Sequence, residues 1–212
     1  MKSYGQYCAL AKALDVVGDR WTLLIVRELM IRDGARYTDL RKGLPGIATN
    51  LLTERLKELE TAGIVWREDA PPPVATTLFR LTDRGEQLGP VLAALGQWGA
   101  PLLPDTPGKD VFCDQWTLLP LRIYLRDQAP SGSRLRVALK AGGESLLLET
   151  TGNGSIKVQP GTSPDADARI EGSPRVILSL LMRRMTLPEA KAKGLKLTGD
   201  RRVLQRFGPK TV

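Results

Sequence analysis

The side chains whose types and spacing could do chemistry in this chain gather between residues 49 and 62. At about 100° per residue, Leu52, Leu56 and Leu59 fall on one narrow side of an α-helix. The polar side chains fall opposite that stripe or on its flank, and they are Thr49, Asn50, Thr53, Glu54 and Lys57. Asn can pair with adenine, Thr can meet a base edge or the thymine methyl group, and Lys can meet guanine or phosphate. Such a helix can pack its back and enter a major groove with its front, although any surface helix of a small domain shows the same division.

The elements around this helix have the order of a winged helix-turn-helix, which favours the reading of bases over a purely structural role. A short helix after Thr38 ends at Gly43, and Pro45 and Gly46 make a turn. Residues 64–68 and 77–81 have strand composition and predict a two-stranded ribbon. Further helices are predicted over residues 8–17, from an Asp19 cap to about residue 30, and from a Thr82 cap to about residue 98. Basic side chains that could hold phosphates lie before, on and after these elements, and they are Arg36, Arg41, Lys42, Arg67 and Arg80.

Composition narrows the classes of function. The 212 residues contain no His and only two cysteines, which excludes His-dependent nucleophile pairs, His-based zinc sites and a four-cysteine zinc site. We therefore expect no catalytic residues, no metal and no cofactor, although catalysis by carboxylates or lysine stays open. So few cysteines indicate a reducing cytoplasm. No apolar run reaches the ~18 residues of a membrane span, so no membrane partner is expected.

The net charge of +8 suits a polyanion partner, but it is unevenly distributed. Residues 1–104 hold 13 Lys and Arg against 12 Asp and Glu, whereas residues 105–212 hold 18 against 11. The half that carries the predicted recognition helix has almost no net charge, so any affinity of this half for DNA must come from where its individual charges are placed.

A proline-rich break near residues 100–108 predicts a domain boundary, with domains at 1–104 and 108–212. The second half predicts a helix over 112–126 and strands over 134–140, 145–150, 155–159 and 166–171. A helix capped by Ser173 over 175–184, a strand over 195–198 and a short helix capped by Asp200 complete it. The predicted fold class is α+β, a winged helix-turn-helix domain followed by an α+β domain.

Residues 6–99 resemble the HxlR-type branch of the MarR-like winged-helix regulators. The motifs that carry the resemblance are the run from Cys8 to Leu29, Leu44-Pro-Gly-Ile47, Leu52-Thr-Glu-Arg-Leu56, Leu59-Glu-Thr-Ala-Gly63 and Phe79-Arg-Leu-Thr-Asp-Arg-Gly85. The resemblance implies a homodimer, built from the first and last helices, on a pseudo-palindromic double-stranded operator. The chain departs from the family at Ala48, where a Ser cap is usual, and at Asn50, where a basic residue is common. The wing tip, residues 70–76, carries no Lys or Arg.

Residues 110–208 resemble sterol carrier protein type-2 domains through Asp167-Ala-Arg-Ile-Glu-Gly-Ser173, the Leu-rich helix and Gly194-Leu-Lys-Leu-Thr-Gly-Asp200. The resemblance implies an apolar tunnel for a lipid-like or other hydrophobic ligand. The candidate lining residues are Phe112, Trp116, Leu119, Ile177, Leu180, Leu181 and Met185. Each of these side chains could equally be core, because an apolar helix over a sheet needs no ligand.

Cys8 is a candidate redox sensor, because some members of the HxlR-type family use a cysteine near this point to detect electrophiles or oxidants. Lys12, one turn along, is the cation in the sequence that could lower its pKa; the alternative is a small buried apolar side chain. We thus expect a dimeric regulator whose recognition helices, residues 49–62, enter the major groove. An apolar effector in the second domain would modulate it. The alternative is a lipid carrier or ligand-binding protein in which the first half only dimerises, and an enzyme using carboxylates or lysine is a further rival.

Overall fold

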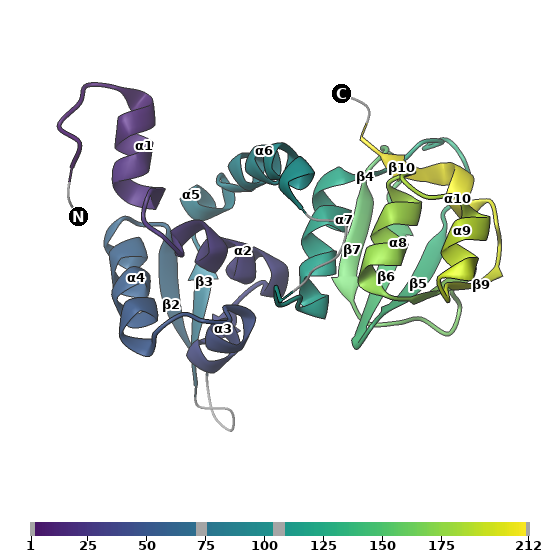
Figure 1. Cartoon of the computed structure of the whole chain (residues 1–212), viewed down its shortest axis with the longest axis horizontal. Coiled ribbons are helices and arrows are strands. Elements are labelled where there is room, and N and C mark those ends of the chain that lie inside the picture. Colours follow the sequence, from purple (N-terminus) through teal and green to yellow (C-terminus); the bar gives the residue numbers. More distant parts are fainter. Residues whose placement is uncertain (1–2, 71–75, 104–108, 211–212) are drawn as a thin grey trace. The chain divides into compact units, whose positions relative to one another are not determined.

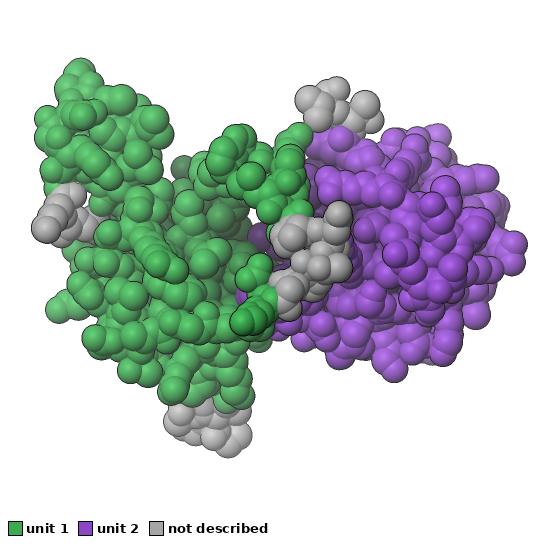
Figure 2. Space-filling model, in the orientation of Figure 1, with its two compact units in different colours: residues 1–111 green, residues 112–212 purple. Residues whose placement is uncertain are grey.

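The computed structural model describes residues 3–70, 76–103 and 109–210, and it divides the chain into two compact units, residues 1–111 and 112–212 (Figures 1 and 2). Both units mix helices and strands, so the predicted α+β class is confirmed. Within the described part of the chain, none of the helices has both the length and the apolar content of a membrane span.

The first unit is a helical bundle with a small sheet. Its helices are α1 (Ala9–Val17), α2 (Thr22–Arg32), α3 (Tyr37–Gly43), α4 (Thr49–Thr61), α5 (Asp83–Glu86) and α6 (Gly89–Gly99), followed by a short 3-10 turn, η1 (Ala100–Leu102). Strands β1 (Ala35–Arg36), β2 (Val65–Ala70) and β3 (Thr76–Leu81) form an antiparallel sheet in the order β1-β3-β2. The ribbon of β2 and β3 was predicted, but β1 was not, because two residues are too few to show a period of two.

The core of this unit lies between α2, α3, α4 and the sheet. Ile25, Leu29, Leu40, Leu52 and Phe79 belong to it, and the first four side chains are almost completely buried. The predicted leucine stripe of α4 is thus the surface by which that helix is anchored.

Two helices of the first unit depart from the prediction. Asp19 does not cap α2: Trp21 occupies the N-cap with a left-handed φ of 80°, and the Asp19 carboxylate instead binds Arg55. The helix that Thr82 caps is short, because α5 ends at Glu86 and α6 begins afresh at Gly89 with Pro90 in its first turn. Proline fits the first turn of a helix but breaks its interior, since it lacks the N–H that a continuing helix needs.

The second unit is built on a five-stranded sheet. The strands are β5 (Arg136–Ala141), β6 (Glu144–Thr150), β7 (Ile156–Pro160), β8 (Ala168–Gly172) and β9 (Lys196–Gly199), in the order β7-β6-β5-β8-β9. Only the β5–β8 pair within this sheet is parallel. Helices α8 (Pro174–Leu181) and α9 (Leu187–Ala192) cover one face of the sheet (Figure 1). A 3-10 turn, η2 (Asp114–Thr117), leads to α7 (Leu118–Tyr124).

A small second sheet joins the two ends of this unit. Strand β4 (Leu125–Asp127) pairs antiparallel with β10 (Phe207–Pro209), which follows α10 (Val203–Arg206). The helix predicted over 112–126 is therefore too long, because its last residues are needed as a strand by a segment about 80 positions further along the chain. The Ser173 cap is confirmed, since its side chain accepts the Val176 N–H.

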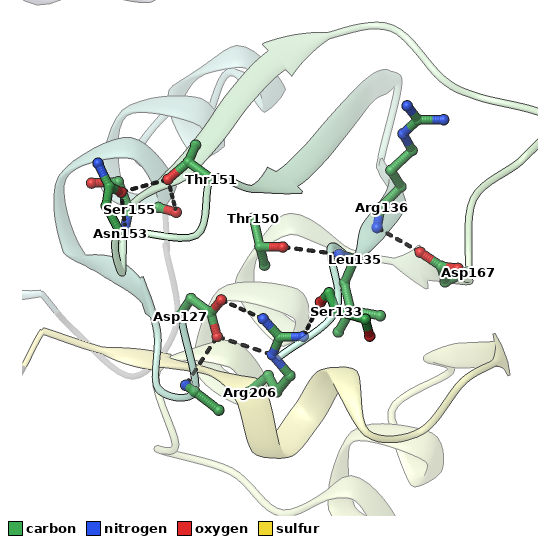
Figure 3. Close-up of polar contacts among 11 residues, drawn as sticks. Asp127, Ser133, Leu135, Arg136, Thr150, Thr151, Asn153, Ser155, Asp167 and Arg206 are labelled. Carbon is green, nitrogen blue, oxygen red and sulfur yellow. Dashed lines mark hydrogen bonds and ion pairs between the residues drawn. The ribbon is translucent and has the colours of Figure 1, made fainter. Parts of the chain in front are cut away.

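A buried ion pair locks β4 to the end of α10 (Figure 3). The guanidinium of Arg206 donates two hydrogen bonds to the Asp127 carboxylate, at 3.0 Å and 2.5 Å, and a third to the backbone oxygen of Ser133. The Asp127 side chain is fully buried and that of Arg206 is 12% exposed. The backbone N–H of Ala129 donates a further hydrogen bond to the Asp127 carboxylate. The charges of Asp127 and Arg206 therefore neutralise each other inside the unit.

Candidate nucleic-acid interface

The polar face of α4 lies open to solvent. Leu52, Leu56 and Leu59 are at most 2% exposed, whereas all five polar candidates on this helix are exposed: Thr49, Asn50, Thr53, Glu54 and Lys57. This is the division that a recognition helix needs, since its back is packed and its front is free.

Two side chains that sequence reasoning missed hold α4 in place. Tyr37, at the start of α3, donates its hydroxyl to the backbone oxygen of Thr49 at 2.8 Å. Arg55 binds the Asp19 carboxylate at 2.7 Å and also pairs with Glu58. Neither contact has a sequence signal, because the partners of Tyr37 and Asp19 are 12 and 36 positions away. The helix is thus tied at its first turn to α3 and near its middle to the start of α2.

A buried carboxylate of α2 packs against the end of α3, where Arg27 also donates a hydrogen bond to the Gly43 backbone oxygen. The Glu28 side chain is completely buried and pairs with Arg27 at 2.9 Å, and its Oε2 lies against Gly43. A Cβ atom built on Gly43 would overlap that oxygen. Position 43, the last residue of α3, therefore accepts only glycine, because any side chain there would collide with the buried carboxylate.

Arg36, Arg41 and Lys42 are exposed on α3 and at its N-cap. Among the described residues, the side chains of Arg41 and Lys42 make no ion pair, so their charges are available to phosphates. These two residues fall in the last turn of α3, directly before the turn into α4.

The two wing arginines are engaged within the protein. Arg67 binds the Glu60 carboxylate, with one N–O distance of 2.6 Å, and its guanidinium lies 5.5 Å from the centre of the Phe79 ring. The Glu60 carboxylate raises the pKa of Arg67. Arg80 pairs with Glu68 and donates to the backbone oxygen of Asp33. Because a glutamate lies beside each of these arginines, their attraction for a phosphate is weaker than the sequence alone suggests.

A groove of about 440 Å³ joins the start of α3 to the wing. It is lined by Arg36, Tyr37, Thr38, Arg67, Thr76, Thr77 and Phe79. Arg36 and Arg67, which are far apart in the sequence, thus reach one surface. The prediction about the wing tip concerns residues 71–75 for the most part, and these lie outside the described residues.

The candidate ligand residues of the second unit do not gather at one place. Leu180 and Met185 line a groove of about 490 Å³ together with Arg183, Arg184, Thr186, Leu187, Glu189 and Leu204. Ile177 and Leu181 are core, at 0% and 1% exposed. Leu119 is half-buried, and Phe112 packs edge-to-face on Trp116 with ring centres 6.0 Å apart.

Cys8 is exposed at the N-cap of α1. The nearby backbone N–H groups of Ala11 and Leu10, in the first turn of α1, lower the pKa of its thiol. Lys12, which sequence reasoning favoured as the cause, instead lies 3.5 Å from the Asp15 carboxylate. Cys113 is half-buried.

Large apolar side chains are exposed on α1 and α6, the first and last α-helices of the first unit. Those on and before α1 are Tyr4, Tyr7, Leu10 and Leu14, and those on and after α6 are Val91, Leu95, Trp98, Leu102 and Leu103. The segment before α1 is held against it, because Asp15 accepts hydrogen bonds from the Ser3 hydroxyl and the Tyr4 N–H, both at 2.8 Å. These bonds lower the pKa of Asp15.

Comparison with known proteins assigns each half of the chain. Residues 16–106 match the HxlR-like helix-turn-helix family, and residues 126–209 match the SCP-2 sterol transfer family. The uncharacterized HTH-type transcriptional regulator YvaP of Bacillus subtilis is 37% identical over 87 residues, which cover 41% of this chain and 80% of YvaP. A second such regulator, sll1512 of Synechocystis, is 37% identical over 100 residues, which cover 47% of this chain and 73% of that protein.

Among solved structures, the reduced form of the transcriptional regulator YodB from B. subtilis is 32% identical, with a TM-score of 0.40 over 44% of this chain and 92% of YodB. The family match, the share of YvaP that is covered and the order of helices and wing all agree. The chain belongs to the HxlR-like helix-turn-helix family, and a segment that matches the SCP-2 sterol transfer family follows in the same chain.

Proposed function

We propose that this protein is a DNA-binding transcriptional regulator whose dimer inserts α4 of each chain into the major groove of a double-stranded operator. One observation carries the proposal: the polar face of α4 is exposed over its whole length while its leucine stripe is buried. Major-groove base edges are read by polar and charged side chains on an anchored helix. The relatives, which are named as transcriptional regulators, support the same function.

The proposed base contacts come from Thr49, Asn50, Thr53, Glu54 and Lys57. The phosphate contacts come first from Arg41 and Lys42, whose charges are unpaired among the described residues, and then from Arg36. Arg67 and Arg80 can reach phosphates only in competition with Glu60 and Glu68, so we assign them a smaller share. Phosphate contacts position the protein, and base contacts select the sequence.

The proposed dimer is built from α1 and α6. The apolar side chains exposed on these helices, including Tyr7 and Trp98, would leave water in the dimer. A two-fold dimer presents its two recognition helices to half-sites one helical turn, ~34 Å, apart, and therefore requires a pseudo-palindromic operator. Residues 1–104 form the proposed DNA-binding and dimerisation domain.

Residues 108–212 form the proposed effector domain. The open groove of about 490 Å³ at the end of α8 falls in the volume range of small-molecule sites. Leu180, Met185 and Leu187 line it together with the charged side chains of Arg183, Arg184 and Glu189. An apolar compound bound there would bias the spacing of the two recognition helices. Native mass spectrometry of the purified chain checks for it, because the proposal requires a bound compound whose removal changes operator affinity. A carrier in which the first half only dimerises leaves the polar face of α4 without a role, and we do not favour it.

Selection from a random DNA pool tests the regulator function. The full-length chain should enrich duplexes that hold two inverted half-sites about 10 base pairs apart, with two chains bound to each duplex. The affinity for the enriched duplex should fall steeply between 50 and 200 mM salt, because phosphate contacts release counterions. Enrichment of no sequence above a scrambled duplex would overturn the proposal.

We also propose that Cys8 is a sensor thiol, which its exposure and lowered pKa support. The thiolate is the reactive form, so Cys8 should be alkylated with a pH midpoint below the ~8.5 of an ordinary cysteine. Mass spectrometry of iodoacetamide time courses between pH 6 and 9 measures that midpoint. The matched control is the same thiol in urea, where the helix N-terminus is absent. Identical midpoints in the folded and unfolded chains would remove the basis for sensing.

A further inference from the structure

The hydroxyl hydrogen of Thr53 is used within the protein. Thr53 lies on the exposed face of α4, and its Oγ1 donates to the backbone oxygen of Thr49 at 3.0 Å. The same Oγ1 lies 3.4 Å from the hydroxyl oxygen of Tyr37. A threonine in a helix can make this bond to the preceding turn in a staggered rotamer, so the arrangement carries no strain.

Tyr37 closes the small network from another element. Its hydroxyl donates to the same oxygen of Thr49 at 2.8 Å, and its side chain is half-buried at the start of α3. The Thr49 oxygen therefore accepts both hydroxyls. For Thr53 to donate its hydroxyl hydrogen to a base, it would have to give up its bond to the Thr49 oxygen.

The remaining branch of the Thr53 side chain is its methyl group. Because the three positions on Cβ are staggered, an Oγ1 directed at the backbone leaves Cγ2 as the branch that is free to contact another molecule. Thr53 stands about 60° around the helix from Asn50, and Lys57 lies between the two directions. An apolar group thus borders an amide and an ammonium on the surface that is proposed to face the bases.

We propose that Thr53 reads the methyl group of a thymine in the operator, an inference that rests on the proposed function of α4. Thymine is the one base that carries a methyl group in the major groove, and a threonine methyl is among its ordinary partners. The neighbouring Asn50 offers the donor and acceptor pair that adenine requires. The half-site therefore contains a thymine whose methyl group meets Cγ2 of Thr53.

Thr61 supplies an internal comparison. Its hydroxyl donates to the Lys57 backbone oxygen at 2.9 Å, so it makes the same bond to the preceding turn. It is exposed at the C-terminal end of α4, away from the N-terminal half that enters a groove. A purely structural role for such bonds would make Thr53 and Thr61 equivalent toward DNA, whereas base reading separates them.

The test uses the duplex that the full-length chain enriches from a random pool. Each thymine of one half-site is replaced in turn by deoxyuridine, which removes only the methyl group, and affinities are measured by fluorescence anisotropy at one salt concentration. The proteins compared are the unaltered chain, Thr53→Ser, Thr53→Val and the control Thr61→Ser. Thermal unfolding of each variant verifies that the fold is kept.

One deoxyuridine position should weaken binding of the unaltered chain about fourfold, the equivalent of ~0.8 kcal/mol for one buried methyl-sized group. Thr53→Val, which keeps a methyl group and lacks the hydroxyl, should show the same loss, as should Thr61→Ser. Thr53→Ser, which keeps the hydroxyl and lacks the methyl group, should bind both duplexes equally.

Two results would overturn the inference while leaving the regulator function intact. In the first, no thymine of the enriched duplex is sensitive to deoxyuridine. In the second, Thr53→Ser keeps the preference for thymine over deoxyuridine, which would show that Cγ2 of Thr53 does not contact the methyl group. A pool that yields no enriched duplex would instead overturn the proposed function, and this inference with it.

Discussion

The double variant Asn50→Ala, Lys57→Ala is expected to lose on the order of 100-fold in affinity for the selected operator. Both side chains are exposed on α4, so their removal leaves the leucine stripe and the fold unchanged. A bidentate Asn–adenine pair contributes about 1–3 kcal/mol of discrimination, and each tenfold change in affinity is about 1.4 kcal/mol. The lysine adds a charge-assisted contact to a base or phosphate. Anisotropy titrations at 100 mM salt measure the loss directly.

A matched control removes the same kinds of side chain elsewhere. Gln205 and Lys191 are exposed in the second unit, and Gln205→Ala, Lys191→Ala takes away one amide and one ammonium without touching α4. This control should bind within about twofold of the unaltered chain, because long-range screening at that salt leaves little of a distant charge. A loss of less than threefold for the α4 variant, or an equal loss for both, would contradict the assignment of base contacts to α4.

Asp127→Ala is expected to destabilise the second unit by about 3–5 kcal/mol. The substitution leaves the guanidinium of Arg206 buried without its counter-charge, and the uncompensated charge costs more than the pair contributed. The loss of stability should be greatest where β4 pairs with β10, because Asp127 lies on β4 and Arg206 directly precedes β10. Hydrogen exchange read by mass spectrometry is the suitable measurement, because it reports the two units separately in a chain that need not unfold in one step.

The companion variant replaces both partners. Asp127→Leu, Arg206→Met removes the two charges together and keeps apolar volume in their place, so it should recover most of the lost protection. Lys140→Ala serves as the surface control, because its ion pair with Glu171 is largely exposed and such pairs contribute little. If Asp127→Ala changes the protection of β4 and β10 no more than Lys140→Ala does, the pair is not a structural lock.

Local pattern was enough to determine the recognition helix and the ribbon that follows it. The period of Leu52, Leu56 and Leu59 predicted a helix over 49–62, and α4 spans Thr49–Thr61. The strands of the ribbon and the Ser173 cap were found in the same way. These signals lie within one or two turns of chain, and burial of one side of an amphipathic element is a demand that the sequence itself records.

The tertiary structure decided what depends on partners distant in the chain. Residues 125–127 carry the end of a helical pattern but form β4, because β10 offers unpaired backbone groups at that place. Arg67 and Arg80 look like free cations in the sequence, yet the fold sets each beside a glutamate. The first turn of α4 is held by Tyr37, 12 positions before Thr49, whose hydroxyl donates to the Thr49 backbone oxygen. Periodicity specifies which side of a helix or strand is buried. Only the tertiary fold specifies which polar side chains form hydrogen bonds and ion pairs with one another, and those contacts determine which side chains remain free to bind a partner.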